Sequence, residues 1–399
     1  MLSYKLYGII KIVNILSETT SLAHFKRLLD QQIDRVHALK NTVNPIDFSK
    51  KTAIRVGICM GDGIGDIITE QAQRVLEAAL IHERATKRVT LVPIHGLTIA
   101  NRLRQGVAIP SDVLDALKAC DVILKGPTTT PQKGDGGPNI ESANVAMRRE
   151  LDLFACVRPI QVPQKGIDWV FFRENTEGEY MLGSSGIDMA ELSIDFKVTS
   201  DIGSERIIRM AFEHAKATHR KRVTVVTKSN VIKATDGRFS EVARRIATEY
   251  TPFGIHCDEW YVDIMAAKLI DPQRQADFEV IVLPNLYGDI LTDQAGQIQG
   301  GLGTAGSANI GTQYAMFEAV HGSAPRMVTD GRAHYANPSS MIKAAAMLLQ
   351  HIGYTASAAA IDQALLRAAS EPSVAITGRP DGATASELTD WIIHQTQLN

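Results

Sequence analysis

The sequence has few cysteines and no long apolar run, and each shortage excludes a class of protein. Its 399 residues contain four cysteines, which are scattered and form no C-x-x-C pair. Isolated thiols of this kind are typical of buried structural side chains rather than of disulfides or zinc ligands. No stretch approaches the roughly 20 apolar residues that a membrane-spanning helix needs. We therefore predict reduced cysteines, a cytoplasmic location and no association with a membrane.

An excess of charge of either sign is also missing. The chain carries 42 Lys and Arg residues against 44 Asp and Glu residues, for a formal net charge of -2. Because there is neither a positive excess nor a basic run interleaved with aromatic residues, nothing favours nucleic-acid binding. The hydrophobic share of 45% and the charged share of 22% are ordinary for a globular protein. The length suits about two domains.

The first 51 residues are predicted to form a helical extension ahead of the main fold. Apolar side chains recur at helical spacing between residues 21 and 40. Residues 5–16 are apolar but are interrupted by Lys11 and Asn14, which makes a poor secretory core. These features favour a helix that packs on the core or on a partner subunit over a targeting segment.

The remainder of the chain alternates short β-rich runs with helical stretches, such as residues 68–80. This alternation favours an α/β architecture with a largely parallel sheet. The runs that we predict to be strands are residues 54–59, 89–94, 121–126, 223–228 and 278–283.

Polar clusters follow four of these runs directly, at the strand ends where open α/β sheets build their sites. They are GDGIG (61–65), KGPTTT (125–130), KSN (228–230) and NLYGD (285–289). GDGIG lacks the third Gly of G-x-G-x-x-G, so we do not predict a Rossmann unit from it. The Gly-rich segment 296–311 is predicted to be close-packed backbone beside a ligand.

Three arginines, Arg148, Arg158 and Arg173, lie within about 25 residues of one another and suit a small polyanionic substrate, because guanidinium groups bind carboxylates bidentately. Asn144 and Arg148 are four apart and would share a helix face, with Ser142 in the first turn beside free backbone donors. The alternative is that Arg148 and Arg149 lie on a solvated helix face and that Ser142 is only an N-cap.

Two carboxylates, Asp289 and Asp293, are also four residues apart and would converge on one face of a helix. Carboxylate oxygens are hard ligands that suit Mg²⁺ or Mn²⁺, and Asp263 is a third candidate ligand. A solvated helix face is the alternative. We favour the metal site because the pair follows a buried-looking strand and precedes the Gly-rich segment.

Tyr180 and Lys228 are the candidate proton-transfer groups. Both have high reference pKa values, and we expect a nearby divalent cation and the arginines to lower the pKa of each side chain. The alternative for each is an ordinary surface or interface residue.

Taken together and in order, these motifs resemble the isocitrate/isopropylmalate dehydrogenase family of metal-dependent decarboxylating dehydrogenases. The resemblance runs from about residue 54 onward, and its combination of motifs is specific. It implies an α/β fold of two domains that is not a true Rossmann fold, with a large cofactor-binding domain (52–136 and 297–399) and a small substrate, metal and dimerisation domain (137–296). The motifs are GDGIG (61–65), KGPTTTP (125–131), SANVAMR (142–148), LDLFACVRP (151–159), RENTEGEY (173–180), TKSNVIK (227–233), PNLYGDILTD (284–293), GGLGTAGSANIG (300–311), HGSAP (321–325), ANP (336–338) and DGATASELTD (381–390).

The resemblance also implies a reaction. Lys228 would act in deprotonating the substrate hydroxyl as hydride leaves for NADP or NAD, and Tyr180 would protonate the enolate that remains after CO₂ departs. A Mg²⁺ or Mn²⁺ ion held by Asp263, Asp289 and Asp293 would stabilise that enolate. In such enzymes Lys228 and Asp263 come from the neighbouring subunit, so a homodimer with shared active sites is implied.

Binding roles follow from the same resemblance. The residues expected to bind the substrate are Ser142, Asn144, Arg148, Arg158, Arg173, Lys125 and Asn230. The residues expected to bind the dinucleotide are Thr130, His321, Gly322, Arg326 and Asn337.

The pattern Ser-x-Asn-x-x-x-Arg favours isocitrate over isopropylmalate as the substrate. An isopropyl group would leave Ser142 and Asn144 without a partner, at a cost of ~1–3 kcal/mol. Homoisocitrate and tartrate remain possible substrates. A regulatory subunit of a hetero-oligomeric isocitrate dehydrogenase is less favoured, because such subunits usually lose catalytic or metal-binding residues.

Three departures from the family pattern affect the prediction. Met60 stands where Pro usually precedes GDGIG, and the loop at 133–139 is longer and richer in Gly. Arg326 follows HGSAP where NAD-using members usually place an Asp, so a cation replaces an acceptor and NADP is modestly favoured over NAD.

Overall fold

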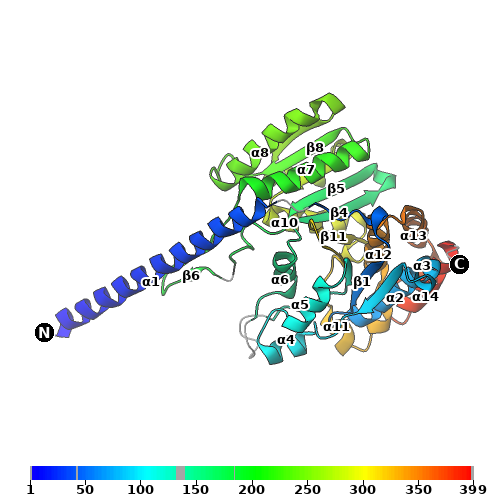
Figure 1. Ribbon diagram of the computed structural model, residues 1–399, viewed down its shortest axis with the longest axis horizontal. Coiled ribbons are helices and arrows are strands. Elements are labelled where there is room, and N and C mark those ends of the chain that lie inside the picture. The colour runs from blue at the N-terminus through cyan, green and yellow to red at the C-terminus, as the bar shows by residue number, and fades with distance from the viewer. Residues whose placement is uncertain (1, 42–43, 132–139, 184, 397–399) are drawn as a thin grey trace.

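The computed structural model describes residues 2–41, 44–131, 140–183 and 185–396, and the long loop at 133–139 lies outside them. One continuous ten-stranded sheet runs through the molecule (Figure 1). In spatial order its strands are β2 (Val89–Pro93), β1 (Ile54–Cys59), β3 (Val122–Lys125), β12 (Ala315–Ala319), β11 (Gly306–Ile310), β4 (Ala155–Val162), β5 (Ile167–Glu174), β10 (Val280–Leu283), β8 (Arg222–Thr227) and β9 (His256–Tyr261).

The sheet is mainly parallel, as the alternation of strands and helices predicted. Its antiparallel pairs are central: β11 runs antiparallel to β12 and β4, and β4 runs antiparallel to β5. The outer strands on both sides pair in parallel. The α/β fold without a simple Rossmann unit is therefore confirmed. The proposed domain division stays a prediction, because both proposed domains contribute strands to this one sheet.

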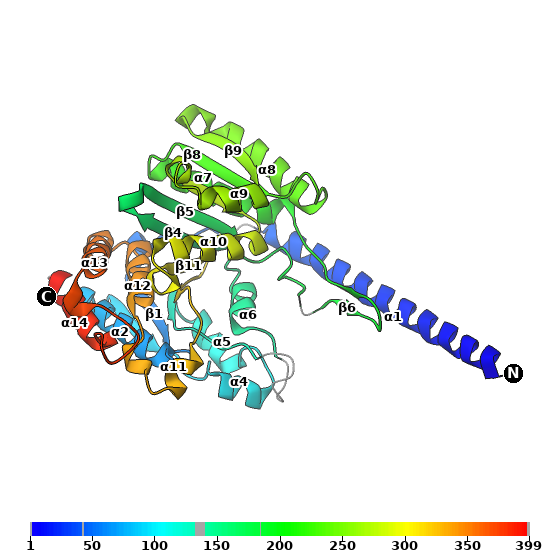
Figure 2. The same cartoon turned by 180° about the vertical axis from the view of Figure 1, so that it is seen from behind.

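Helices cover both faces of the sheet. α7 and α8 pack on one face of β5, β10 and β8, and α9 and α10 pack on the other (Figures 1 and 2). The helices are α1 (Leu2–Leu39), α2 (Gly65–Ala79), α3 (Ile81–Ala85), α4 (Ile99–Gln105), α5 (Ser111–Lys118), α6 (Ala143–Glu150), α7 (Asp201–Ala217), α8 (Thr235–Tyr250), α9 (Val262–Leu269), α10 (Asn285–Gln299), α11 (Pro325–Thr329), α12 (Ser339–His351), α13 (Thr355–Ala368) and α14 (Ala385–Thr396). None of the described helices is long and apolar enough to cross a membrane.

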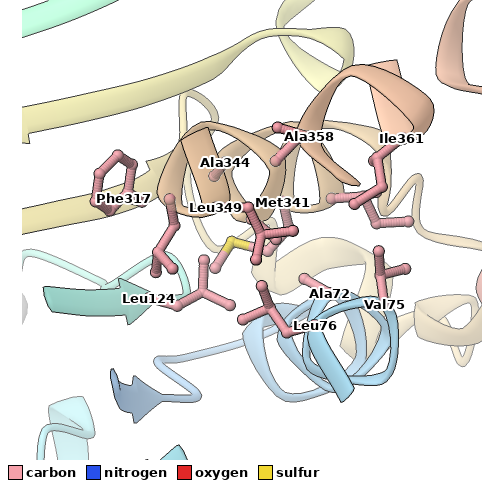
Figure 3. Close-up of a cluster of buried hydrophobic side chains, with 14 of the residues drawn as sticks. Ala72, Val75, Leu76, Leu124, Phe317, Met341, Ala344, Leu349, Ala358 and Ile361 are labelled. Carbon is pink, nitrogen blue, oxygen red and sulfur yellow. The ribbon is translucent and has the colours of Figure 1, made fainter. Parts of the chain in front are cut away.

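The largest core lies between the β1–β3–β12 part of the sheet and helices α2, α12 and α13 (Figure 3). Leu76, Leu349 and Ile361 are completely buried in this cluster, which also includes Phe317 of β12. Full burial of each such side chain contributes about 1.5–3 kcal/mol. This packing fixes β1 and β3, so the loops that follow these strands start from rigid positions.

Five strands match the predicted runs with ends that agree within two residues, whereas β4, β5, β9, β11 and β12 were not predicted. The end of the Gly-rich segment 296–311 is close-packed, since a Cβ at Gly306 would approach the backbone N of Ala344 in helix α12 to 2.9 Å. A ligand beside the segment stays a prediction.

The predicted N-terminal helix is observed as α1, which projects from the body (Figure 1). Its C-terminal half contacts the rest of the chain. Leu28 is buried, Phe25 lies 5.4 Å from Phe196 between ring centroids, and His24 Nε2 lies 2.8 Å from the carbonyl oxygen of Ser185. Ser185 precedes a two-stranded antiparallel sheet formed by β6 (Ile187–Asp188) and β7 (Ser193–Ile194).

Candidate active site

The three predicted arginines lie together although they come from three elements. Arg148 is on α6, Arg158 on β4 and Arg173 on the adjacent strand β5, and each is at least nine-tenths buried. Arginine side chains are rarely buried unless they are paired, and three buried guanidinium groups at one place indicate a site for anions. The alternative of a solvated helix face is therefore wrong for Arg148, which is 8% exposed.

Carboxylates on α10 pair with two of these arginines. Arg173 Nη1 donates to Asp289 Oδ1, and Arg158 Nη1 donates to Asp293 Oδ1 at 3.0 Å. Arg148 reaches only Glu318 Oε1, at 3.4 Å, and its buried Nε has no hydrogen-bond partner among the described residues. Such an orphaned donor is costly unless a ligand accepts from it.

The two α10 carboxylates differ in their electrostatics. Burial opposes the ionisation of Asp289, but Arg173 and the hydrogen bond from Tyr180 outweigh it and lower the pKa of Asp289. At Asp293, burial together with the charge of Asp289 outweighs Arg158 and raises the pKa. The site therefore holds one firmly ionised carboxylate beside a second that is half-exposed and more weakly held.

Tyr180 joins the same cluster, since its hydroxyl donates to Asp289 Oδ2 at 2.7 Å and the Arg173 guanidinium carbon lies 5.5 Å from its ring centroid. The expected lowering of the pKa of Tyr180 by a divalent cation and the arginines stays a prediction, because the arginines alone do not produce it. Burial and the hydrogen bond to Asp289 raise the pKa of Tyr180 to about 12, against the opposing charges of Arg173 and Arg148. The phenol is therefore protonated at neutral pH and can act as a proton donor.

Lys125 is buried and shares the carboxylate of Glu318 with Arg148. It is completely buried at the end of β3, and its Nζ lies 2.8 Å from Glu318 Oε2 on the neighbouring strand β12. Burial opposes ionisation of Glu318, but Lys125 and Arg148 lower its pKa to about 2. Lys125 thus reaches Arg148 through Glu318, a residue that the sequence reasoning did not single out.

Ser142 and Asn144 lie at the start of α6. Ser142 occupies the N-cap position but its side chain makes no capping hydrogen bond, so the N-cap alternative is wrong in that respect. Asn144 Oδ1 accepts from Thr128 Oγ1 at 3.0 Å, which joins α6 to the loop that follows β3. The Ser142 hydroxyl and the Asn144 amide nitrogen are thus left as donors for a ligand.

Lys228 and Asp263 form a second, separate group. Lys228 Nζ donates to Asp263 Oδ1 at 2.5 Å, and the Asp263 side chain is 62% exposed. The backbone N of Lys228 donates to Asp236 Oδ2 at 2.7 Å, and Asn230 lies exposed two residues further on. Within the described part of one chain, no three carboxylate, His or Cys side chains come together as a metal site. Asp263 is therefore not gathered with Asp289 and Asp293 in a single copy.

Three loops, two of which carry residues expected to bind the dinucleotide, meet around Asp62. Asp62 Oδ1 accepts from the backbone N of Ile99 at 2.7 Å, and Oδ2 accepts from that of Thr129 at 2.9 Å. Thr129 Oγ1 lies 2.7 Å from Ser323 Oγ. Gly63, with φ +61°, is required here, because a Cβ would come within 2.0 Å of the Ser323 carbonyl oxygen. GDGIG is thus a tight turn clamped between KGPTTT and HGSAP.

The predicted cofactor residues are Thr130, next to Thr129, and His321, Gly322, Arg326 and Asn337 on the segments that follow β12. Thr130 and Gly322 are exposed, and His321 Nδ1 lies 3.0 Å from the Gly322 carbonyl oxygen. Asn337 Oδ1 accepts from the backbone N of Ser339 at 2.9 Å at the start of α12. Arg326 lies on α11, and its exposed side chain makes no ion pair with any described residue.

The donor set fits a hard divalent cation. Asp289 and Asp293 present carboxylate oxygens from successive turns of α10, and Asp293 is half-exposed. Such ligands suit Mg²⁺ or Mn²⁺, and a cation here would compete with Arg173 and Arg158 for the same oxygens. Buried guanidinium groups beside a phenol and paired carboxylates define a site for a small polyanionic substrate.

Comparison with known proteins identifies the family to which this chain belongs. Residues 55–390 match the isocitrate/isopropylmalate dehydrogenase family, and the chain belongs to that family. The predicted resemblance is therefore confirmed, and α1 lies outside the matched region.

Particular relatives are isocitrate dehydrogenases. The chain is 38% identical to the NADP isocitrate dehydrogenase of Rickettsia prowazekii strain Madrid E over 319 residues, which cover 77% of this chain and 62% of the relative. It is 33% identical to subunit 2 of the mitochondrial NAD isocitrate dehydrogenase of Schizosaccharomyces pombe, over 89% of this chain and 91% of the relative. The crystal structure of isocitrate dehydrogenase from Methylococcus capsulatus matches with a TM-score of 0.74 and 35% identity, over 86% of this chain and 99% of that one. The chain thus spans less than two thirds of the length of the Rickettsia relative.

Proposed function

We propose that this protein is an isocitrate dehydrogenase, which oxidises and decarboxylates isocitrate to 2-oxoglutarate. One observation carries the proposal: three buried guanidinium groups surround Tyr180 and Asp289, and the Nε of Arg148 lacks a partner among the described residues. A substrate with three carboxylates supplies the missing acceptors.

The first turn of α6 supports isocitrate over its relatives. The Ser142 hydroxyl makes no capping bond, and Asn144 is held by Thr128 with its amide nitrogen left as a donor. Both groups can donate to the carboxylate that distinguishes isocitrate from isopropylmalate. An isopropyl group there would leave them unpaired, at about 1–3 kcal/mol.

The proton transfers fall to two side chains. Lys228 takes the proton of the substrate hydroxyl while the carbon that bears this hydroxyl is oxidised. Tyr180 then donates a proton to the carbon from which CO₂ has left. The raised pKa of Tyr180, to about 12, keeps it protonated for that step. Arg148, Arg158 and Arg173 hold the substrate carboxylates while these transfers occur.

The site is completed by groups from outside one chain. When bound, a nicotinamide dinucleotide supplies the hydride acceptor, and Mg²⁺ or Mn²⁺ supplies positive charge beside the reacting oxygens. Asp289 and Asp293 would hold the metal, with Asp263 from a second copy. We therefore propose a homodimer with shared sites, since Asp263 and Lys228 form a pair apart from Asp289 in one copy.

NADP is the proposed dinucleotide. The exposed Arg326, which has no ion-pair partner among the described residues, places a free cation directly after HGSAP. A guanidinium suits a ribose phosphate, whereas a ribose with free hydroxyls favours an acidic acceptor. Thr130, His321, Gly322 and Asn337 are proposed to contact the same dinucleotide. The four cysteines form no disulfide, which supports a reducing compartment such as the cytoplasm.

The test is an initial-rate assay of dinucleotide reduction with purified protein, D-isocitrate and Mg²⁺ or Mn²⁺, run in parallel with NADP⁺ and NAD⁺. We expect metal-dependent reduction with a preference for NADP⁺. Matched reactions contain homoisocitrate, isopropylmalate or tartrate in place of isocitrate. Turnover of one of these in preference to isocitrate would reject the substrate assignment and leave the family membership intact.

A further inference from the structure

The N-terminal helix α1 reaches the candidate active site through one side chain. Arg35 Nη2 lies 2.5 Å from Glu177 Oε1, and the Arg35 side chain is 18% exposed while that of Glu177 is 3% exposed. Glu177 belongs to the segment 173–180, which also carries Arg173 and Tyr180. A helix outside the region matched to the family therefore donates a cation to a buried carboxylate beside the site.

The Glu177 carboxylate is held tightly and leaves little room for movement. It accepts from the Ser200 hydroxyl at 2.5 Å and from the Ser200 backbone N at 2.8 Å. A Cβ at Gly203 would come within 2.4 Å of the carboxylate carbon, so the group lies against the first turn of α7. Among the described residues, Arg35 is the only cation that forms an ion pair with Glu177.

The backbone of Glu177 connects this ion pair to the substrate side of the site. Its carbonyl oxygen accepts from Asn285 Nδ2 at 2.9 Å. Asn285 Oδ1 in turn accepts from Arg173 Nε at 3.0 Å and Nη2 at 2.6 Å. Arg173 also pairs with Asp289, the acceptor of the Tyr180 hydroxyl. The chain of contacts thus runs from Arg35 through Glu177 and Asn285 to Arg173.

A second buried carboxylate makes the cation necessary. Glu174 is 3% exposed, and its Oε2 accepts from the backbone N of Glu177 at 2.6 Å. Burial and the charge of Glu177 raise the pKa of Glu174 well above its usual range. Two neighbouring buried carboxylates repel one another, so loss of Arg35 would leave Glu177 without its compensating charge and favour a shift of the segment.

We propose that Arg35 is a positioning residue for the candidate site, because its ion pair with Glu177 fixes the segment 173–180 and, through Asn285, the guanidinium of Arg173. The proposal deepens the proposed function and rests on it for its kinetic readout. It assigns to α1 a part in substrate binding rather than in packing alone.

The test compares three full-length variants. Arg35→Met removes the charge at similar length, Arg35→Lys retains a cation, and Lys26→Met is the matched control on the same helix. Among the residues that the structure describes, Lys26 pairs only with Asp30, four residues on, in an exposed ion pair of 3.0 Å. Should Arg35→Met fail to fold, Arg35→Gln, which keeps a donor but no charge, takes its place.

For Arg35→Met we expect the KM for isocitrate to rise about tenfold while the KM for the dinucleotide changes less than about twofold. Arg35→Lys recovers most of the loss, and Lys26→Met behaves as the unmodified protein. A merely structural role would lower the active fraction, and so kcat, with both KM values unchanged. That result, or an unchanged KM for isocitrate in folded Arg35→Met, would overturn the proposal.

Amide hydrogen exchange of the segment 173–180 separates this proposal from the proposed function. We expect faster exchange there in Arg35→Met than in Lys26→Met, with or without substrate. If the unmodified protein does not oxidise isocitrate, the proposed function fails and the exchange measurement still decides the role of Arg35. Equal exchange in the two variants would reject that role.

Discussion

Tyr180 donates its hydroxyl hydrogen to Asp289 across 109 positions of sequence, at an O–O distance of 2.7 Å. Asp289 also pairs with Arg173, so one carboxylate fixes both the candidate proton donor and a candidate substrate-binding cation. This arrangement explains why the phenol stays protonated beside two arginines. Burial and Asp289 together outweigh the arginine charges, and the pKa of Tyr180 rises to about 12.

Replacement of Tyr180 by Phe removes the proposed proton donor and little volume. We expect kcat for oxidative decarboxylation to fall about 10²–10⁴-fold, which is the usual contribution of a positioned general acid, with a small change in KM. Tyr354→Phe is the control, since its buried hydroxyl has no partner among the described residues. Steady-state measurements of kcat and KM test this prediction. A Tyr180→Phe enzyme within a few-fold of full activity would refute the role of Tyr180 as proton donor.

Arg148 and Arg149 are neighbours on α6 with different surroundings. Arg148 is buried with an orphaned Nε, whereas Arg149 is exposed and pairs with Glu141 at 2.6 Å. We expect Arg148→Met to raise the KM for isocitrate about 10–100-fold, because a charge-assisted hydrogen bond is lost. Arg149→Met should leave KM unchanged. Similar kinetic effects from both substitutions would contradict the placement of Arg148 in the substrate site.

Glu318 joins the candidate site to the core, because its carboxylate pairs with the fully buried Lys125 and with Arg148. Replacement of Glu318 by Gln leaves that ammonium group without a counter-charge, and we expect the free energy of unfolding to fall by about 3–5 kcal/mol. Adding Lys125→Met should recover part of this loss, since it removes the unpaired charge. Denaturant unfolding measures both effects.

The control for this experiment is Asp330→Asn, which removes an exposed ion pair with Arg332. Exposed pairs of this kind contribute about 0–1 kcal/mol. If Glu318→Gln were no more destabilising than Asp330→Asn, the Lys125–Glu318 pair would not be a structural support.

The strands that lead into candidate site residues could be predicted from the sequence. β1, β3, β8 and β10 are short apolar runs followed directly by polar clusters. The sequence did not predict β4, in which Arg158 and Pro159 interrupt the apolar pattern, or β11, which reads GSANI. Those two strands form antiparallel pairs in the centre of the sheet, where tertiary packing outweighs local propensity.

The two carboxylates whose roles were missed in the site are Glu318 and Asp62. Glu318 lies inside the strand β12, where no local pattern marks it, whereas Asp62 stands in GDGIG but its contacts with other loops cannot be read from that motif. Their partners are distant: 170 positions separate Glu318 from Arg148, and 67 separate Asp62 from Thr129. Only the fold shows that each carboxylate joins groups that the motifs already indicated.

Two half-buried histidines predict a loss of stability in mild acid. Burial lowers the pKa of His214 and of His351 from 6.5 to about 4. As pH falls below about 6.5, the unfolded chain binds protons at these rings before the folded chain does, so their contribution to stability is lost between pH 6.5 and 4. Above that window neither ring contributes a pH dependence.

Urea unfolding at several pH values within this window tests the effect. We expect the urea midpoint of His351→Gln to fall less steeply with decreasing pH than that of the unmodified protein. The substitution removes one of the two groups whose pKa is lowered in the folded state. His82→Gln is the control, since His82 is exposed on α3. Identical slopes for His351→Gln and the unmodified protein would show that His351 is not held neutral by its burial against Phe48 and Phe317.

The separation of Lys228 from Tyr180 allows a direct test of a shared site. In one copy, Lys228 pairs with Asp263, whereas Tyr180 pairs with Asp289. If a working site takes Tyr180 from one subunit and Lys228 from its partner, Lys228→Met and Tyr180→Phe homodimers each lack one group in both sites. A heterodimer of the two variants has one site with both groups intact and one site with neither.

Random re-assortment of equal amounts of the two variants makes half of the dimers mixed, so about a quarter of the unmodified activity should return. We expect this recovery only after subunit exchange, and we expect none when either variant is incubated alone. Sites built from a single chain predict no recovery at any mixing ratio, because every chain would carry one disabled group. The same mixture therefore distinguishes a dimer that merely packs from one whose partner supplies Lys228 and Asp263 to the chemistry.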